Sequence, residues 1–63
     1  MIGVMTGKEM VKLLQDSGFV LARINGSHHL MACGEVTVAV PVHGKKELGK
    51  GLEHSILKQA GLK

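Results

Sequence analysis

The sequence predicts an α+β fold in which a helix, three antiparallel strands and a second helix follow one another along the chain. Three observations carry this prediction. The chain opens with an amphipathic helical pattern, two glycine-containing turns divide its middle into three β-prone segments, and apolar residues recur at helical spacing near its end. Strands joined by tight turns form an antiparallel meander, and two helices can cover its apolar face.

The first predicted helix covers residues 7–17. Thr6 and Glu9 have the spacing of a capping box, in which each side chain accepts a hydrogen bond from the backbone amide of the other residue. Gly18 suits the left-handed conformation that ends many helices. Between these signals, apolar residues share one helical face and form a candidate core surface: Met10, Val11, Leu13 and Leu14.

The middle of the chain predicts three strands. Residues 19–24 and 27–32 form the first pair, joined by Asn25-Gly26, because both turn residues tolerate positive φ. Cys33-Gly34 marks a second tight turn. The third strand, residues 35–40, alternates valines with smaller or polar residues, which is the period of a half-buried strand.

The end of the chain predicts a basic segment followed by the second helix. Pro41 is expected to end the third strand or to mark a sheet edge, because proline cannot donate to the ladder. Three lysines and a histidine fall within residues 43–50. Gly49 or Gly51 is the best available N-cap and Gly61 the terminating glycine. The apolar helical face in between consists of Leu52, Ile56, Leu57 and Ala60.

The composition indicates one small basic domain. The chain has 63 residues and a formal net charge of +3, and we expect a single domain over residues 1–63 with a flexible N-terminus at residues 1–5. The positive charge favours an anionic partner, either nucleic acid or an acidic protein. No apolar stretch reaches the roughly 18 residues of a membrane span and no signal-peptide pattern is present, so we expect a cytoplasmic protein without a membrane partner.

Histidines are the main candidates for chemistry. His28 follows the predicted turn at the start of a strand, which exposes its imidazole, and a reference pKa of about 6.5 suits a general acid or base. Taken alone, such a histidine is more often a surface residue. Alternation places His29 on the opposite face of the sheet, packed or hydrogen-bonded beneath it. His43 is a candidate second acid or base, although structural loop histidines are commoner. The histidine spacings, His54 included, match no metal-ligand pattern, so no cofactor is predicted.

Basic residues flank the same region. Arg23 lies in the first predicted strand, and Lys45, Lys46 and Lys50 follow the third. Guanidinium and ammonium groups there could contact phosphates or stabilise charge in a transition state. For any single lysine, a solvated basic loop is an equally good explanation.

Motifs along nearly the whole chain resemble those of HicA toxins, the toxins of HicAB toxin–antitoxin systems. The resemblance lies in the opening helix with Gly7-Lys8-Glu9, in Gly26-Ser27-His28-His29 after an arginine-bearing strand, and in residues 41–48 and 55–62. It spans about residues 5–62 in the family's order. Each motif is weak alone, and together they are specific.

Two departures from the family pattern concern the C-terminal half. Glu53 and His54 stand where the family usually carries a leucine and then an arginine, so a basic group is missing from the second helix. Leu52 is a candidate to take over the packing role of that leucine. Ala39 lengthens the third strand relative to many members.

The resemblance implies a double-stranded-RNA-binding-like fold, cleavage of messenger RNA without a metal, and a HicB-type antitoxin as protein partner. It implies His28 as the catalytic residue, and we hypothesise a general base that leaves a 2′,3′-cyclic phosphate and a 5′-hydroxyl. Gly26 and Ser27 would then shape the turn, with Gly26 also letting RNA approach closely. His29 would support His28 from behind.

Two other interpretations stay open. The chain could be a small RNA-binding module without catalysis, although it is short for the roughly 16 base pairs that double-stranded-RNA-binding domains span. It could also be a degenerate toxin that only binds its antitoxin.

Overall fold

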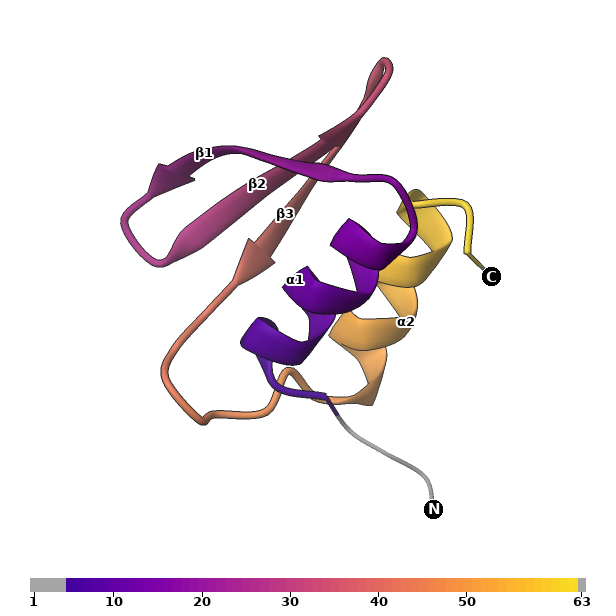
Figure 1. Cartoon of the computed structure of the whole chain (residues 1–63). Coiled ribbons are helices and arrows are strands. Elements are labelled where there is room, and N and C mark those ends of the chain that lie inside the picture. Colours follow the sequence, from indigo (N-terminus) through magenta and orange to yellow (C-terminus); the bar gives the residue numbers. More distant parts are fainter. Residues whose placement is uncertain (1–4, 63) are drawn as a thin grey trace.

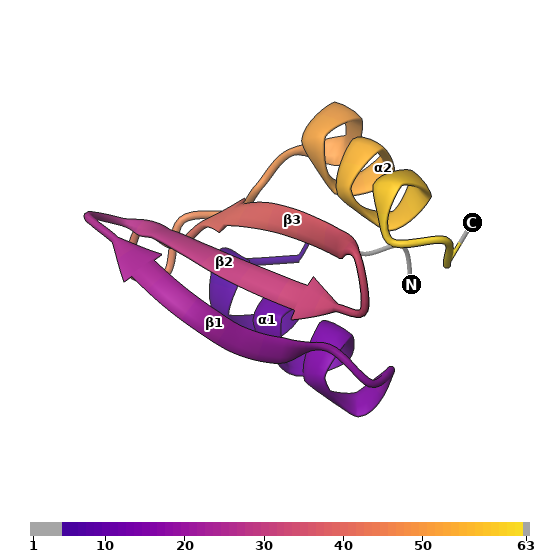
Figure 2. The ribbon, with the colours of Figure 1, turned by 90° about the horizontal axis from the view of Figure 1, so that it is seen from above.

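The computed structural model describes residues 5–62 and confirms the predicted order of elements. Its helices and strands are α1 (Gly7–Asp16), β1 (Val20–Asn25), β2 (His28–Cys33), β3 (Val36–Pro41) and α2 (Lys50–Gln59). The strands form an antiparallel sheet in the order β1-β2-β3. Both helices lie on the same side of this sheet (Figure 1), and Figure 2 looks onto its other side. This is the α+β architecture of the double-stranded-RNA-binding-like fold that the resemblance implied.

A complete capping box starts α1. The Glu9 amide donates to Thr6 Oγ1 at 3.2 Å, and the Thr6 amide donates to Glu9 Oε1 at 3.0 Å. These bonds satisfy backbone donors that have no partner inside the helix. The predicted start of the helix is therefore confirmed.

Replacing Thr6 with alanine is expected to lower the free energy of unfolding by about 1 kcal/mol, because the Glu9 amide loses its acceptor. Urea denaturation followed by circular dichroism measures the change. Thr6→Ser keeps the hydroxyl and is expected to stay close to the wild type. Equal destabilisation by serine and alanine would show that the Thr6 hydroxyl does not carry the effect.

A Schellman motif ends α1 at Asp16, one residue before the predicted end. Gly18 has a φ of 103°, and the Phe19 amide donates to the Leu14 carbonyl at 2.9 Å. The Phe19 and Leu14 side chains are both buried, which is the apolar contact that accompanies this motif. The bond therefore directs the chain from the helix into β1.

The first hairpin turn lies one residue later than predicted. Its loop is Gly26-Ser27, so Asn25 belongs to β1 and pairs with His28. Gly26 has a φ of 63° and Ser27 does not have a positive φ. This is the type II′ pattern, with glycine in the first loop position, whereas the sequence prediction assumed type I′ with glycine second. The prediction of Asn25-Gly26 as the loop was wrong by one residue.

The second hairpin repeats this difference. Its loop is Gly34-Glu35, again with positive φ at the glycine alone, and Cys33 pairs with Val36 across it. The register between β2 and β3 then continues without interruption to Pro41, which pairs with His28. Pro41 is the last residue of an edge strand, as predicted.

An irregularity in β1 sets which side chains share a face of the sheet. Leu21 pairs with Met31, whereas Arg23 pairs with Leu30, so Ala22 is an extra residue in β1. Strict alternation would place Leu21 and Arg23 on the same face. The bulge reverses this and places Arg23 on the face of Leu30, away from the helices. The sequence contained no signal for it.

The core lies between the sheet and the two helices. Met10 is fully buried, as predicted, and Met31 of β2 is fully buried as well. Leu52 differs from the prediction, because 41% of it is exposed and Leu48 contacts the core instead. The buried apolar residues are Met10, Leu14, Phe19, Met31, Val38, Val40, Ile56 and Leu57.

A glycine lies at each end of α2. Gly49 is the N-cap, and Gly61, with a φ of 76°, ends the helix. The residue before the N-cap of α1, Met5, is hydrogen-bonded to this second helix and to the loop before it. The Met5 amide donates to Glu53 Oε1 at 3.4 Å and its carbonyl accepts from the Leu48 amide at 2.8 Å. Of the expected flexible segment, residues 1–4 lie outside the described residues. Neither described helix is long and apolar enough to cross a membrane.

Candidate functional site

One face of the sheet displays His28 on the side away from both helices. Directly paired residues point to the same face of an antiparallel sheet, so His28 shares its face with Asn25 of β1 and Pro41 of β3. Arg23 lies on the same face through its pairing with Leu30, two residues along from His28. We call this side of the sheet, defined by Arg23, Asn25, His28 and Pro41, the open face. The side chains of Arg23, Asn25 and His28 are exposed.

His29 lies on the other face of the sheet, as alternation predicts. It pairs with Val40, which is fully buried in the core, and with Ile24 on the other side. His29 is half-buried, and its Nδ1 atom is buried without a hydrogen-bond partner among residues 5–62. The residue therefore packs beneath the sheet, directly next to His28 in the chain.

A loop of residues 42–49, called the basic loop below, is attached to the turn that precedes His28. The Val42 amide donates to the Ser27 carbonyl at 2.7 Å, which continues the pairing of β2 and β3 beyond Pro41. The loop then reverses through a turn in which the Lys46 amide donates to the His43 carbonyl at 3.0 Å. As a result, the exposed Lys46 and His43 belong to the same end of the sheet as His28.

The far end of the basic loop is tied to the start of α1. Thr6 and Glu47 form an isolated antiparallel bridge, and the Leu48 amide donates to the Met5 carbonyl. The loop is therefore held at both ends by backbone hydrogen bonds, which reduces the freedom of the lysines it carries.

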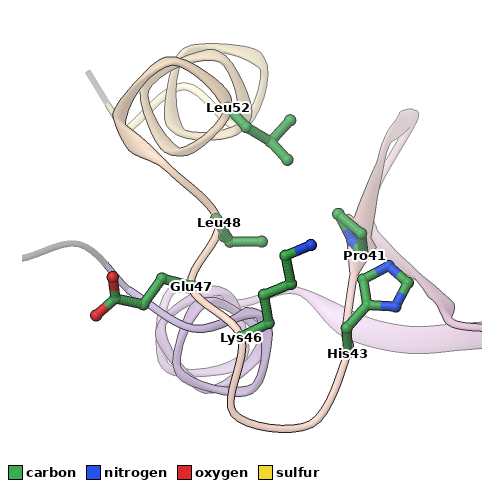
Figure 3. Close-up of a pocket in the computed structure, with 6 residues that line it drawn as sticks. All are labelled: Pro41, His43, Lys46, Glu47, Leu48 and Leu52. Atoms are coloured by element: carbon green, nitrogen blue, oxygen red, sulfur yellow. The ribbon is translucent and has the colours of Figure 1, made fainter.

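The basic loop borders a pocket of about 250 Å³. Figure 3 shows Leu48 and Leu52 on one side of this space, and Pro41 and His43 on the other. The Lys46 side chain extends across the space toward Pro41, whereas the Glu47 carboxylate points away from it. The pocket therefore has apolar side chains on both sides, with the imidazole of His43 beside Pro41, and a cation that extends across it. We call it the loop pocket.

The structure brings most of the predicted site residues to one end of the sheet. Arg23 and His28 are on the open face, Gly26-Ser27 form the turn, and His43, Lys45 and Lys46 lie in the basic loop. Lys50 is the first residue of α2, directly after the loop.

Two histidines lie apart from this arrangement. His29 is on the opposite face of the sheet, and His54 belongs to α2. Within residues 5–62, no three His, Cys, Asp or Glu side chains lie close enough together to hold a metal ion.

The turn before His28 leaves space around it. A Cβ atom added to Gly26 would meet no described atom within 4 Å. The outer side of the turn is therefore open to a ligand.

Sequence reasoning missed Asn25 as a member of the site. It was assigned to the turn, whereas the structure places it in β1 with its exposed side chain next to His28 on the open face. The sequence does contain a signal for this arrangement. Gly26-Ser27 has glycine in the first position, which suits a type II′ loop, and such a loop pairs Asn25 with His28. An amide there can donate and accept hydrogen bonds.

The chain was compared with known proteins. A family model described as "HicA toxin of bacterial toxin-antitoxin" matches residues 7–62, which include His28 and the basic loop. A relative from Pseudomonas fluorescens (strain Pf0-1), described as "Probable mRNA interferase HicA", is 38% identical over 55 residues. This alignment covers 87% of the chain and 92% of the relative.

Proposed function

The chain belongs to the HicA family of bacterial toxins, and on this basis we propose that it cleaves messenger RNA with His28 as the general base. One observation carries the catalytic assignment: His28 is exposed on the open face, beside Arg23 and Asn25 and next to the basic loop. An exposed histidine with cationic neighbours is suited to proton transfer beside a phosphodiester.

The proposed reaction begins with proton transfer from a ribose 2′-hydroxyl to the neutral imidazole of His28. The 2′-oxygen attacks the adjacent phosphorus and the bond from phosphorus to the 5′-oxygen breaks. The products are a 2′,3′-cyclic phosphate and a 5′-hydroxyl, with the 5′-oxygen taking a proton from an acid. His43 is our candidate for that acid, because it is exposed in the loop attached to the turn before His28.

Arg23 is proposed to stabilise the negative charge that develops on the phosphoryl oxygens. Its guanidinium has donors in a planar fork that fits two such oxygens. The pairing of β1 with β2 supports this role, since Arg23 pairs with Leu30, which lies on the face of His28. Asn25 is proposed to orient the imidazole or the ribose through its amide.

The basic loop and the first residue of α2 are proposed to hold the RNA backbone. Lys45 is exposed in the basic loop, and Lys50 is exposed as the first residue of α2, directly after the loop. Each phosphate that a lysine neutralises releases counterions, so the affinity falls as salt rises.

Replacing Lys45 or Lys50 with alanine is therefore expected to weaken RNA binding and to flatten its salt dependence. The slope of log K against log salt should fall by about 0.7 for each lost contact with single-stranded RNA. Titration of fluorescent RNA at several salt concentrations measures it. Lys58→Ala removes the same charge near the end of α2 and should leave the slope unchanged. If all three variants share the wild-type slope, these lysines do not contact phosphates.

We propose a HicB-type antitoxin as the protein partner, because the chain is a HicA toxin with a net charge of +3 that suits an acidic surface. The proposed site of action is the cytoplasm, where messenger RNA is translated. Incubation of the purified protein with RNA tests the proposed activity directly. A nuclease shortens the RNA, a binding module shifts it without shortening, and a degenerate toxin does neither while still binding its antitoxin.

A further inference from the structure

The loop pocket is linked to the proposed catalytic site through Pro41. Pro41 lines the pocket and is the direct cross-strand partner of His28 on the open face. His43, another lining residue, follows the residue whose amide bonds to Ser27. An RNA strand with its scissile phosphate at His28 therefore has a neighbouring nucleotide beside this pocket.

The size of the pocket restricts what it can hold. Its volume of about 250 Å³ lies below the range of about 300–1,000 Å³ that is typical for drug-sized ligands. One flat ring system fits such a space, whereas several nucleotides do not. Its apolar walls, Leu48, Leu52 and Pro41, suit the faces of a planar ring. Leu52 is 41% exposed, so this wall is accessible from outside.

The hydrogen-bonding groups at the pocket favour some nucleobases over others. Lys46 extends across the opening, and an ammonium group can only donate hydrogen bonds. The carboxylate of Glu47 points away, so it offers no acceptor to a ligand in the pocket. A ring with a carbonyl oxygen can accept from Lys46, whereas a ring amino group at the same position would face another donor.

We propose that the loop pocket binds one nucleobase with a carbonyl at position 6 of a purine or position 4 of a pyrimidine, guanine or uracil, from the nucleotide next to the scissile phosphate. This rests on the proposed function, because the RNA must pass His28. The phosphates of the same strand would lie near Lys45 and Lys50. These cations favour RNA as the ligand over a protein that inserts an apolar side chain into the pocket. The pocket would then contribute to the sequence preference of cleavage.

Matched pairs of short RNAs test this proposal. Each is a 2′-O-methyl pentamer with one base and abasic flanks, carrying uracil or cytosine in one pair and hypoxanthine or adenine in the other. Within each pair, a carbonyl with its neighbouring ring N–H is exchanged for an amino group beside an unprotonated ring nitrogen, and the methyl group prevents cleavage. Dissociation constants are measured by NMR titration, with the methyl resonances of Leu48, which also lines the pocket, as reporters. For the wild type we expect the carbonyl member to bind about fivefold more tightly or better.

Two variants with the same charge change separate the base contact from general attraction. Lys46→Met removes the donor but keeps an apolar stem, and we expect the ratio within each pair to fall to about twofold or less. Lys45→Met removes an ammonium that does not line the pocket. It should weaken both members of a pair equally and keep their ratio. Leu52→Trp, at an exposed position, should fill the pocket and weaken all four RNAs.

The proposal is overturned if the wild type binds both members of each pair equally, or if Lys46→Met keeps the ratio. It is also overturned if Leu52→Trp abolishes antitoxin binding but leaves RNA binding unchanged, because a protein side chain would then occupy the pocket. Failure of the catalytic assignment is recognised separately. Cleavage that survives His28→Ala, together with a ratio that depends on Lys46, rejects the role of His28 and supports the pocket.

Discussion

Replacement of His28 with alanine is expected to reduce RNA cleavage by about 10²–10⁴-fold, the contribution of a well-placed general base. The imidazole is exposed on the open face, so its removal leaves no cavity in the core. The free energy of unfolding should therefore change by no more than about 0.5 kcal/mol. Single-turnover cleavage of a short labelled RNA measures the loss. Analysis of the wild-type product ends should show a 2′,3′-cyclic phosphate.

His54→Ala is the matched control for this experiment. It removes the same side chain from α2, away from the open face, and should cleave RNA at the wild-type rate. The His28→Ala protein should still shift RNA in a binding assay, because Arg23 and the basic loop remain. Full cleavage by the His28→Ala protein would reject the catalytic assignment. Loss of both folding and cleavage would show a structural role instead.

Replacement of Gly7 with alanine is expected to cause the largest loss of stability that we predict for a single substitution. Gly7 is buried at the start of α1, where it contacts the backbone after β3. An added Cβ would overlap the carbonyl oxygen of Pro41 and lie 2.9 Å from the Cα of Val42. Both neighbours are backbone atoms, which cannot rotate away as a side chain can. The helix must therefore move away from the sheet.

The expected cost is about 3 kcal/mol, at the upper end of the usual range for overpacking. A domain of 63 residues has a total stability of roughly 3–9 kcal/mol, so a large part of it would be lost. Thermal and urea denaturation measure the change. RNA cleavage should fall with the folded fraction, because Pro41 and Val42 join the sheet to the basic loop.

Gly51→Ala is the control for this experiment, because it is expected to stabilise the protein. Gly51 lies inside α2 without positive φ, and a Cβ there would meet no described atom within 4 Å. Alanine should stabilise this helix by about 0.5–1 kcal/mol, because glycine loses more backbone freedom on folding. If the two alanine variants change stability equally, the close contact of Gly7 with Pro41 is not the cause.

The order of elements could be predicted because its signals are local. Thr6 and Glu9 satisfy backbone donors within one helical turn, and Gly18 and Gly61 end helices through conformations that other residues rarely adopt. The candidate site was only partly predictable. His28, Arg23 and the lysines could be named from composition, motif and family resemblance, but which of them share a face could not.

The sequence by itself determined where helices and strands form, and that His28 and His29 face opposite sides of one strand. These properties depend on chemistry within a few residues and on the two-residue period of a strand. Only the tertiary structure decided that Asn25, and not Arg23, is the direct partner of His28, and that Leu21 and Arg23 lie on opposite faces. The physical reason is register. The type II′ loop at Gly26-Ser27 makes Asn25 the partner of His28, whereas a loop at Asn25-Gly26 would have paired Arg23 with it. The bulge at Ala22 then shifts the pairing by one residue, which places Leu21 and Arg23 on opposite faces.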